Sequence, residues 1–190
     1  MHKAHRDDQS GVSLVEVLVT MVILAIGLLG LVGLQARLQI LQGEAYQRAQ
    51  ALMLLKDITG RIANNRNNAG AYVTGADNPI WEGNCPTDVS TRRNADIAEW
   101  CNLLQGASEE TVADARVGAM VGGRGCVEEL DDDGHYMVTV AWQGLAPIAA
   151  PPESVACGFG DYDGGTVCVE DLCRRAVTSI VRIADLTETP

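Results

Sequence analysis

Hydrophobic residues are concentrated in one run near the start of the chain. Residues 17–36 (VLVTMVILAIGLLGLVGLQA) form twenty consecutive positions without a charged side chain. As a helix, a run of this length spans about 30 Å, which is the hydrocarbon thickness of a bilayer. A short hydrophilic stretch, MHKAHRDDQSG, precedes the run, and no Ala-x-Ala cleavage site follows it. The pattern therefore predicts a membrane-spanning helix that stays attached to the mature protein.

The helical pattern continues beyond this run. Apolar or small residues recur at steps of three or four and predict one stripe, made of Leu38, Leu41, Ala45, Ala49, Leu52, Leu55, Ile58 and Ile62. No proline occurs in residues 12–63, and an asparagine-rich stretch followed by Gly70 predicts a stop. We expect one helix over residues 12–63, transmembrane in its first half and packed on a globular head in its second.

Residues 64–190 alternate in shorter runs. Residues 136–142 and 176–183 have the period of strands, residues 116–120 and 125–128 are shorter candidates, and residues 96–104 favour a short helix. The sequence predicts an α+β head in which an antiparallel sheet lies against the distal half of the long helix.

The distribution of charged residues predicts the orientation of the chain across the membrane and argues against a nucleic-acid partner. The chain has a net charge of -11, and because the first 63 residues sum to +1, residues 64–190 carry -12. Nucleic-acid binding needs a basic face, so we expect no nucleic-acid partner. Lys3 and Arg6 precede the apolar run and place the N-terminal stretch in the cytoplasm and the head on the outer side of the membrane.

All cysteines follow the apolar run, at Cys85, Cys101, Cys126, Cys157, Cys168 and Cys173. An even number on one side of a membrane span predicts disulfides in an oxidising compartment. Zinc is the weaker alternative because there is no CxxC pair and only His135 is near the cysteines. The acidic stretches 131–134 and 161–164 lack the full spacing of a calcium loop and favour turns. We expect neither a metal nor a cofactor.

Glu16 stands out at the head of the apolar run. Alone, it is explained as a first-turn carboxylate favoured by the helix dipole. With its surroundings, residues 11–19 (GVSLVEVLV), it resembles the class III signal of type IV prepilins. The resemblance implies that a prepilin peptidase cuts between Gly11 and Val12 and methylates the Val12 amine, and that Glu16 pairs with the terminal amine of a neighbouring subunit. The first mature residue of that family is usually Phe, so Val12 is a departure.

A glycine series makes the resemblance finer. The phrase GLLGLVGLQ, with Gly27, Gly30 and Gly33, is similar to the start of PilV-type minor pilins, the type IV pilus modification proteins. Segments of the head (DIAEW, GCVE, YMVTVAWQGL and RRAVTSIVRIADL) look similar too. The resemblance implies the type IV pilin fold. The three glycines favour either close helix packing or local melting of the helix.

The sequence leaves fifteen pairings of the six cysteines open. The pairing we expect joins Cys85 to Cys101 around the short helix, Cys126 to Cys157 across the hairpin that contains Trp142, and Cys168 to Cys173 in the last loop.

No motif for catalysis is present, neither a nucleophile elbow nor a phosphate-binding loop nor a zinc-protease helix. We expect a non-enzymatic minor pilin with residues 1–11 as a cleaved leader and residues 64–190 as a periplasmic head. Expected partners are prepilin peptidase, the major pilin, other minor pilins, a pilus-tip adhesin and the inner membrane. The expected role is priming of pilus assembly at or near the tip, supporting twitching motility and adhesion. The alternatives are a minor pseudopilin of a type II secretion system and a signal-anchored periplasmic protein.

Overall fold

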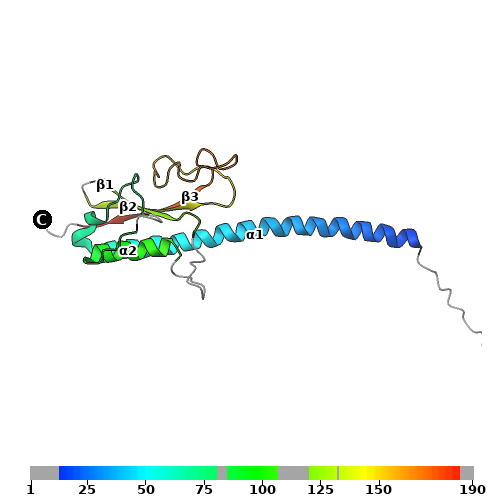
Figure 1. Cartoon of the computed structure of the whole chain (residues 1–190), viewed down its shortest axis with the longest axis horizontal. Helices are drawn as coiled ribbons and strands as arrows, with labels where there is room; N and C mark the ends of the chain where they lie inside the picture. The colour runs from blue at the N-terminus through cyan, green and yellow to red at the C-terminus, as the bar shows by residue number, and fades with distance from the viewer. Residues whose placement is uncertain (1–12, 81–84, 107–119, 132, 185–190) are drawn as a thin grey trace, which may run out of the picture. The chain divides into compact units, whose positions relative to one another are not determined.

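The computed structural model describes residues 13–80, 85–106, 120–131 and 133–184 of the chain. The chain forms two compact units, one ending at Leu41 and the other beginning at Gln42. In chain order the elements are helix α1, the 3₁₀ helix η1, helix α2 and strands β1, β2 and β3 (Figure 1). Most of the expected strand at 116–120 lies outside the described residues.

Helix α1 spans Leu14–Asn64, 51 residues, which confirms the predicted long N-terminal helix. Among the described elements it is the one helix long and apolar enough to cross a membrane, by length and composition alone. It ends where the Asn65 amide donates to the carbonyl oxygens of both Arg61 and Ile62, at 3.0 and 3.1 Å. The 3₁₀ helix η1, Arg66–Tyr72, follows directly. The α-helix therefore ends at the first residue of the asparagine-rich stretch, as predicted.

The buried face of α1 differs from the predicted stripe. Of the predicted positions, Leu55, Ile58 and Ile62 are buried, but Leu41 and Leu52 are 63% and 48% exposed. The residues that are buried are Gln47, Ala51, Leu54, Leu55, Ile58 and Ile62. Two overlapping sets of positions recur every three or four residues along this part of the helix, and periodicity does not choose between them. The head packs on the set that contains Ala51 and Leu54, and this choice brings the polar Gln47 inside.

Helix α2, Arg92–Leu104, begins four residues before the expected start. The reason is its N-cap, because the Thr91 hydroxyl accepts a hydrogen bond from the Asn94 amide at 3.1 Å. The buried side chains Ile97, Trp100, Cys101 and Leu104 recur every three or four residues, so one face of α2 enters the core.

The sheet contains strands β1 (Arg124–Asp131), β2 (His135–Gln143) and β3 (Arg174–Arg182), in that order and antiparallel. Val127 on β1 lies opposite Val138 on β2, and both are fully buried in one core with Ile58 of α1 and Trp100 of α2. A long helix and a small antiparallel sheet form this α+β arrangement, which is consistent with the pilin fold and confirms the predicted fold class.

The first half of the outer edge of β1 is already occupied. The amides of Thr74 and Gly75 both donate to the Val127 carbonyl, and Ile80 exchanges two backbone hydrogen bonds with Gly125. The segment after η1 therefore covers the first half of β1, at Gly125 and Val127, on the side that faces away from β2.

Three disulfides join Cys85 to Cys101, Cys126 to Cys157 and Cys168 to Cys173, the same pairs that the sequence analysis preferred. Cys126 precedes the core residue Val127 on β1, so its side chain points to the opposite face of the sheet. There it forms a second buried cluster with Ala141, Cys157 and Tyr162. This cluster fastens the connection between β2 and β3 to the sheet face that α1 does not cover.

Candidate functional site

Glu16 lies in the first turn of α1. The Ser13 carbonyl accepts hydrogen bonds from the amides of Glu16 and Val17, at 3.0 and 3.3 Å, so the helix is already established at this position. The Glu16 side chain is exposed among exposed apolar neighbours. A carboxylate in such a surface becomes costly once water is removed, unless a cation accompanies it. Gly11 and Val12, the residues of the predicted cleavage site, lie outside the described residues.

The part of α1 that follows Glu16 presents apolar side chains on all its faces. Its exposed large hydrophobic residues are Val17, Leu18, Val19, Met21, Val22, Ile23, Leu24, Ile26, Leu28, Leu29, Leu31, Val32 and Leu34. Gly27, Gly30 and Gly33 lie in the same stretch, and a Cβ atom added to any of them would meet nothing within 4 Å. A helix that is apolar all around suits lipid or a protein interior. The packing role predicted for the three glycines stays a prediction.

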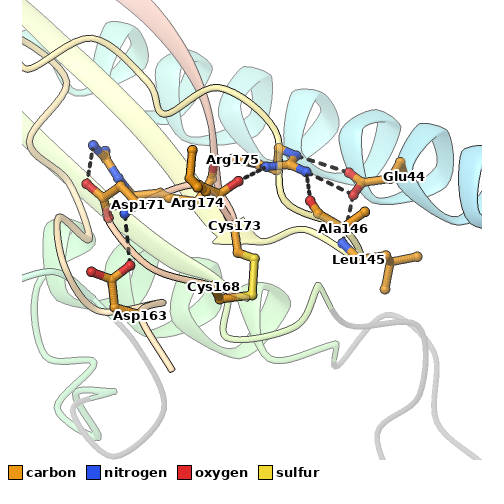
Figure 2. The surroundings of a disulfide bond; sticks show 10 residues. Glu44, Leu145, Ala146, Asp163, Cys168, Asp171, Cys173, Arg174 and Arg175 are labelled. Carbon is orange, nitrogen blue, oxygen red and sulfur yellow. Dashed lines mark hydrogen bonds and ion pairs between the residues drawn. A yellow bond between two sulfur atoms is a disulfide. The ribbon is translucent and has the colours of Figure 1, made fainter. Parts of the chain in front are cut away.

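Further along α1, Glu44 binds the end of the sheet. The Arg175 guanidinium at the start of β3 forms an ion pair with Glu44, with Nη2–Oε1 at 3.2 Å and Nε–Oε2 at 3.3 Å (Figure 2). The Leu145 amide donates to Glu44 Oε1 at 2.7 Å, and Arg175 Nη2 also donates to the Ala146 carbonyl. The Arg175 side chain is only 10% exposed, so this forked pair is better shielded from water than a surface salt bridge.

A second polar connection ties α2 and η1 to α1. Arg61 on α1 contacts three carboxylates, those of Asp57 at 2.7 Å, Glu99 at 2.8 Å and Asp96 at 3.1 Å. Asp96 is 3% exposed and also accepts a hydrogen bond from the Tyr72 hydroxyl at 2.6 Å. The hydrogen bond to Glu99 is the largest contribution that raises the pKa of Arg61, and the same contact lowers the pKa of Glu99. Burial, and next the bond to Asp96, raises the pKa of Tyr72.

Residues 6–32 match the family model described as the prokaryotic N-terminal methylation motif. The chain carries a prepilin-type N-terminal signal. The match includes Gly11, Val12 and Glu16 and ends within the apolar part of α1, so it covers the signal and not the head. No match was found among curated proteins or among solved structures.

The signal supports a type IV pilin-like protein and fits the apolar α1 as the membrane anchor of a pilin. Such a signal implies processing by a prepilin peptidase and assembly with other pilins. Pilin-like proteins are structural subunits, which favours a non-enzymatic role. The comparisons do not support the finer likeness to PilV-type proteins.

The connection between β2 and β3 in this pilin-like head contains a buried ion pair. Arg174 Nη2 lies 3.0 Å from Asp171 Oδ2, and both side chains are at most 4% exposed. Arg174 also donates to the Val155 and Cys157 carbonyls and lies over the exposed Phe159 ring, 5.6 Å from its centroid. A buried pair with such hydrogen bonds fixes the geometry of a loop, because breaking it leaves a charge without compensation.

Aspartate carboxylates in the acidic stretches of the head bind amide and guanidinium groups of the protein itself. The Asp131 carboxylate accepts hydrogen bonds from the amides of Asp133 and His135, as expected of a turn before Gly134. Asp161 forms an ion pair with Arg124 at 3.2 Å, and Asp163 accepts from the Asp171 amide at 2.8 Å. Within the described ranges no group of three or more His, Cys, Asp or Glu side chains is arranged to hold a metal ion.

The contacts that attach the head to α1 have almost no signal in the sequence pattern. Glu44, Arg61, Asp96 and Arg175 carry no motif, and their partners lie 35 to 131 residues away in the chain. The one local signal is the i,i+4 spacing of Asp57 and Arg61, which predicts a helix-surface ion pair but not the two further carboxylates.

Proposed function

We propose that the protein is a minor pilin of a bacterial type IV pilus. The observation that carries the proposal is the prepilin-type signal over residues 6–32, with Gly11 before the apolar α1 and Glu16 in its first turn. In this role a prepilin peptidase cuts between Gly11 and Val12 and methylates the new amine. The disulfide-containing head lies in the periplasm while α1 is in the inner membrane.

Assembly follows from the charges at the start of α1. Cleavage creates an ammonium group at Val12, four residues from the Glu16 carboxylate. In a stack of subunits the Glu16 of one copy neutralises the terminal ammonium of its neighbour, so two charges that are costly in an apolar interior compensate each other. Cleavage thereby makes the chain competent for insertion into a filament whose core is made of helices like α1.

The place of the protein in the pilus is the finer part of the proposal. Its glycine phrase at residues 27–35 and its head segments resemble PilV-type minor pilins, which favours a complex with other minor pilins that primes polymerisation of the major pilin. The position is at or near the tip, next to a tip adhesin, in support of twitching motility and adhesion. The alternative with the same signal is a minor pseudopilin of a type II secretion system, and a signal-anchored periplasmic protein is the remaining one.

Mass spectrometry of the chain made in cells with a prepilin peptidase tests the processing step. We expect a product that begins at Val12 and carries one methyl group, and we expect Gly11→Ala to keep residues 1–11. A Gly11→Ala variant that is cut at the same bond contradicts the proposed site. An unprocessed wild-type chain favours the signal-anchored alternative.

Crosslinking in cells then identifies the neighbours. Crosslinks to the major pilin and to other minor pilins support the minor-pilin role. Crosslinks to secretion pseudopilins instead favour the second alternative. A Glu16→Ala variant gives a matched control, because it should be cleaved and yet lose the crosslinks within the filament.

A further inference from the structure

The disulfide between Cys168 and Cys173 closes a ring of six residues with an unusual backbone. Glu170 and Asp171, two consecutive residues within it, have φ angles of +54° and +60°. Side chains other than glycine rarely adopt this left-handed conformation, and it persists where the surrounding structure enforces it. The ring segment, residues 168–173, is therefore held in place by its contacts.

Asp171 provides most of these contacts. Its amide donates to Asp163 Oδ1 at 2.8 Å, and its own Oδ1 accepts from the Gly160 amide at 2.9 Å. Its other carboxylate oxygen lies 3.0 Å from the Arg174 guanidinium. Figure 2 shows Asp163, Asp171 and Arg174 gathered beside the disulfide. The covalent closure thus encloses both strained residues, and the buried ion pair holds one of them, Asp171.

The ring segment also holds the segment that contacts α1. The Cys173 carbonyl accepts from the Gly144 amide at 2.7 Å, and the Leu172 carbonyl accepts from the Ile148 amide at 2.8 Å. Between these two anchor points, Leu145 donates to Glu44 on α1. Arg175, two residues after the ring closes, completes the contact by its ion pair with Glu44 and its bond to the Leu172 carbonyl. The ring segment thus anchors residues 144–148 on both sides of the hydrogen bond from Leu145 to Glu44.

Access distinguishes this disulfide from one of the other two. Cys168 is half-buried between the exposed side chains of Val167 and Val169, whereas Cys126 and Cys157 are both fully buried. Cys85 is also half-buried, but its disulfide joins the segment before α2 to α2 and not to the Glu44 contact. A dithiol in solution can thus reach a sulfur of the ring without opening the core.

We propose that the Cys168–Cys173 disulfide is a redox-sensitive latch that, while closed, keeps residues 144–148 bound to Glu44 of α1 and, once reduced, releases them. A thiolate of a dithiol attacks Cys168 Sγ and forms a mixed disulfide, and Cys173 Sγ leaves as a thiolate that takes up a proton. The second thiol of the reductant then attacks the mixed disulfide. The products are two cysteine thiols and the cyclic disulfide of the reductant, so two electrons pass from the dithiol to the ring.

Release follows from the backbone. Without the covalent closure Glu170, which lacks the contacts of Asp171, relaxes to negative φ, and the Leu172 and Cys173 carbonyls that follow it turn away from the amides of Ile148 and Gly144. Arg175 loses the neighbouring carbonyl that helps to orient it, and Glu44 loses the Leu145 amide.

Amide hydrogen exchange on the full chain in detergent micelles tests the latch. We expect the Leu145 and Ile148 amides to exchange at least about ten-fold faster after treatment with dithiothreitol. The double variant C168S/C173S should reproduce this change without a reductant. In the matched control, C85S/C101S, the same two amides should stay protected. Unchanged exchange in C168S/C173S overturns the proposal, and so does an equal loss of protection in the control.

A glycine substitution tests the role of strain separately. Glu170→Gly removes the cost of the positive φ, so the reduced ring keeps more of its shape and the acceleration by dithiothreitol should be smaller than in the wild type. Glu153→Gly is the matched control, because Glu153 is an exposed glutamate in the same connection and does not have a positive φ. It should leave the acceleration unchanged. An acceleration that is the same in Glu170→Gly as in the wild type contradicts the proposed release mechanism.

Discussion

Trp100 is fully buried and lies against the backbone of β1 at Gly125, where a Cβ atom would overlap the indole ring. We expect Gly125→Ala to destabilise the head by about 2 kcal/mol, because the ring or the strand must shift in a close-packed core. Urea unfolding followed by tryptophan fluorescence measures the change. A variant as stable as the wild type would show that Trp100 has room to move.

A glycine-to-alanine substitution at Gly60 serves as the control, because we expect it to raise the stability of the protein and not to lower it. Gly60 lies within α1, is exposed, and has nothing within 4 Å of a built Cβ atom. Alanine is a better helix former than glycine, so Gly60→Ala should stabilise the protein by up to about 1 kcal/mol.

Tyr162 gives a prediction about alkaline pH. Burial, as the largest cause, raises the pKa of its hydroxyl well above the usual value of about 10. The folded state thus holds this proton more tightly than the unfolded state, and the resulting stability is complete below pH 10 and lost as the pH rises through the folded-state pKa. The fall in urea midpoint between about pH 9 and about pH 11 should be smaller in Tyr162→Phe than in the wild type.

The phenylalanine variant has a second, independent readout. The Tyr162 hydroxyl donates to the Gly122 carbonyl at 2.8 Å, so near pH 7 the variant should be less stable by about 1 kcal/mol. Parallel pH profiles of the two proteins would contradict a buried, titrating Tyr162.

At the scale of elements, α2 depends on its cap. Thr91→Ala removes the acceptor for the Asn94 amide and should cost about 1 kcal/mol, whereas Thr91→Ser keeps a hydroxyl and should stay close to the wild type. Thermal unfolding followed by circular dichroism compares the three proteins. Equal melting temperatures for the alanine and serine variants would show that the cap contributes nothing.

Elements with a strong local pattern could be predicted from the sequence. The apolar run and the absence of proline predict α1, and alternating residues predict β2 and β3, whose observed bounds differ by at most two residues. The predicted start of α2 is four residues too late because the first turn, which begins with Arg92 and Arg93, contains no large apolar residue. The periodicity of apolar residues indicates the buried face of a short helix but gives no signal for a polar first turn.

Contacts between elements could not be predicted in the same way. The rotation of α1 against the sheet depends on how the whole core packs, so Leu52 is exposed and Gln47 is buried. The carboxylate of Glu44 finds its partner only when β3 comes beside α1. The N-terminal signal differs from these contacts because it is a linear motif. Gly11, Val12 and Glu16 are identified by their spacing in the sequence, and the folded structure adds little to that identification.

At the scale of the whole molecule, the disulfides should differ in their contribution to stability. Cys126 and Cys157 are 31 residues apart, and Cys168 and Cys173 only 5. A longer closed loop restricts the unfolded chain more, so C126S/C157S should cost about 3 to 4 kcal/mol and C168S/C173S clearly less. Urea unfolding of the two variants tests this order. A larger loss in C168S/C173S would show that native contacts, and not loop length, set the contribution.

The segment that covers β1 also limits how the protein can aggregate. An antiparallel sheet grows by strand addition only at an edge with free backbone groups, and an open-ended stack needs two such edges in each molecule. Here the backbone of Thr74, Gly75 and Ile80 already takes up the outer groups of β1 at Val127 and Gly125. Strand addition is therefore blocked along the first half of the outer edge of β1, which leaves a shorter edge for open-ended stacking of heads.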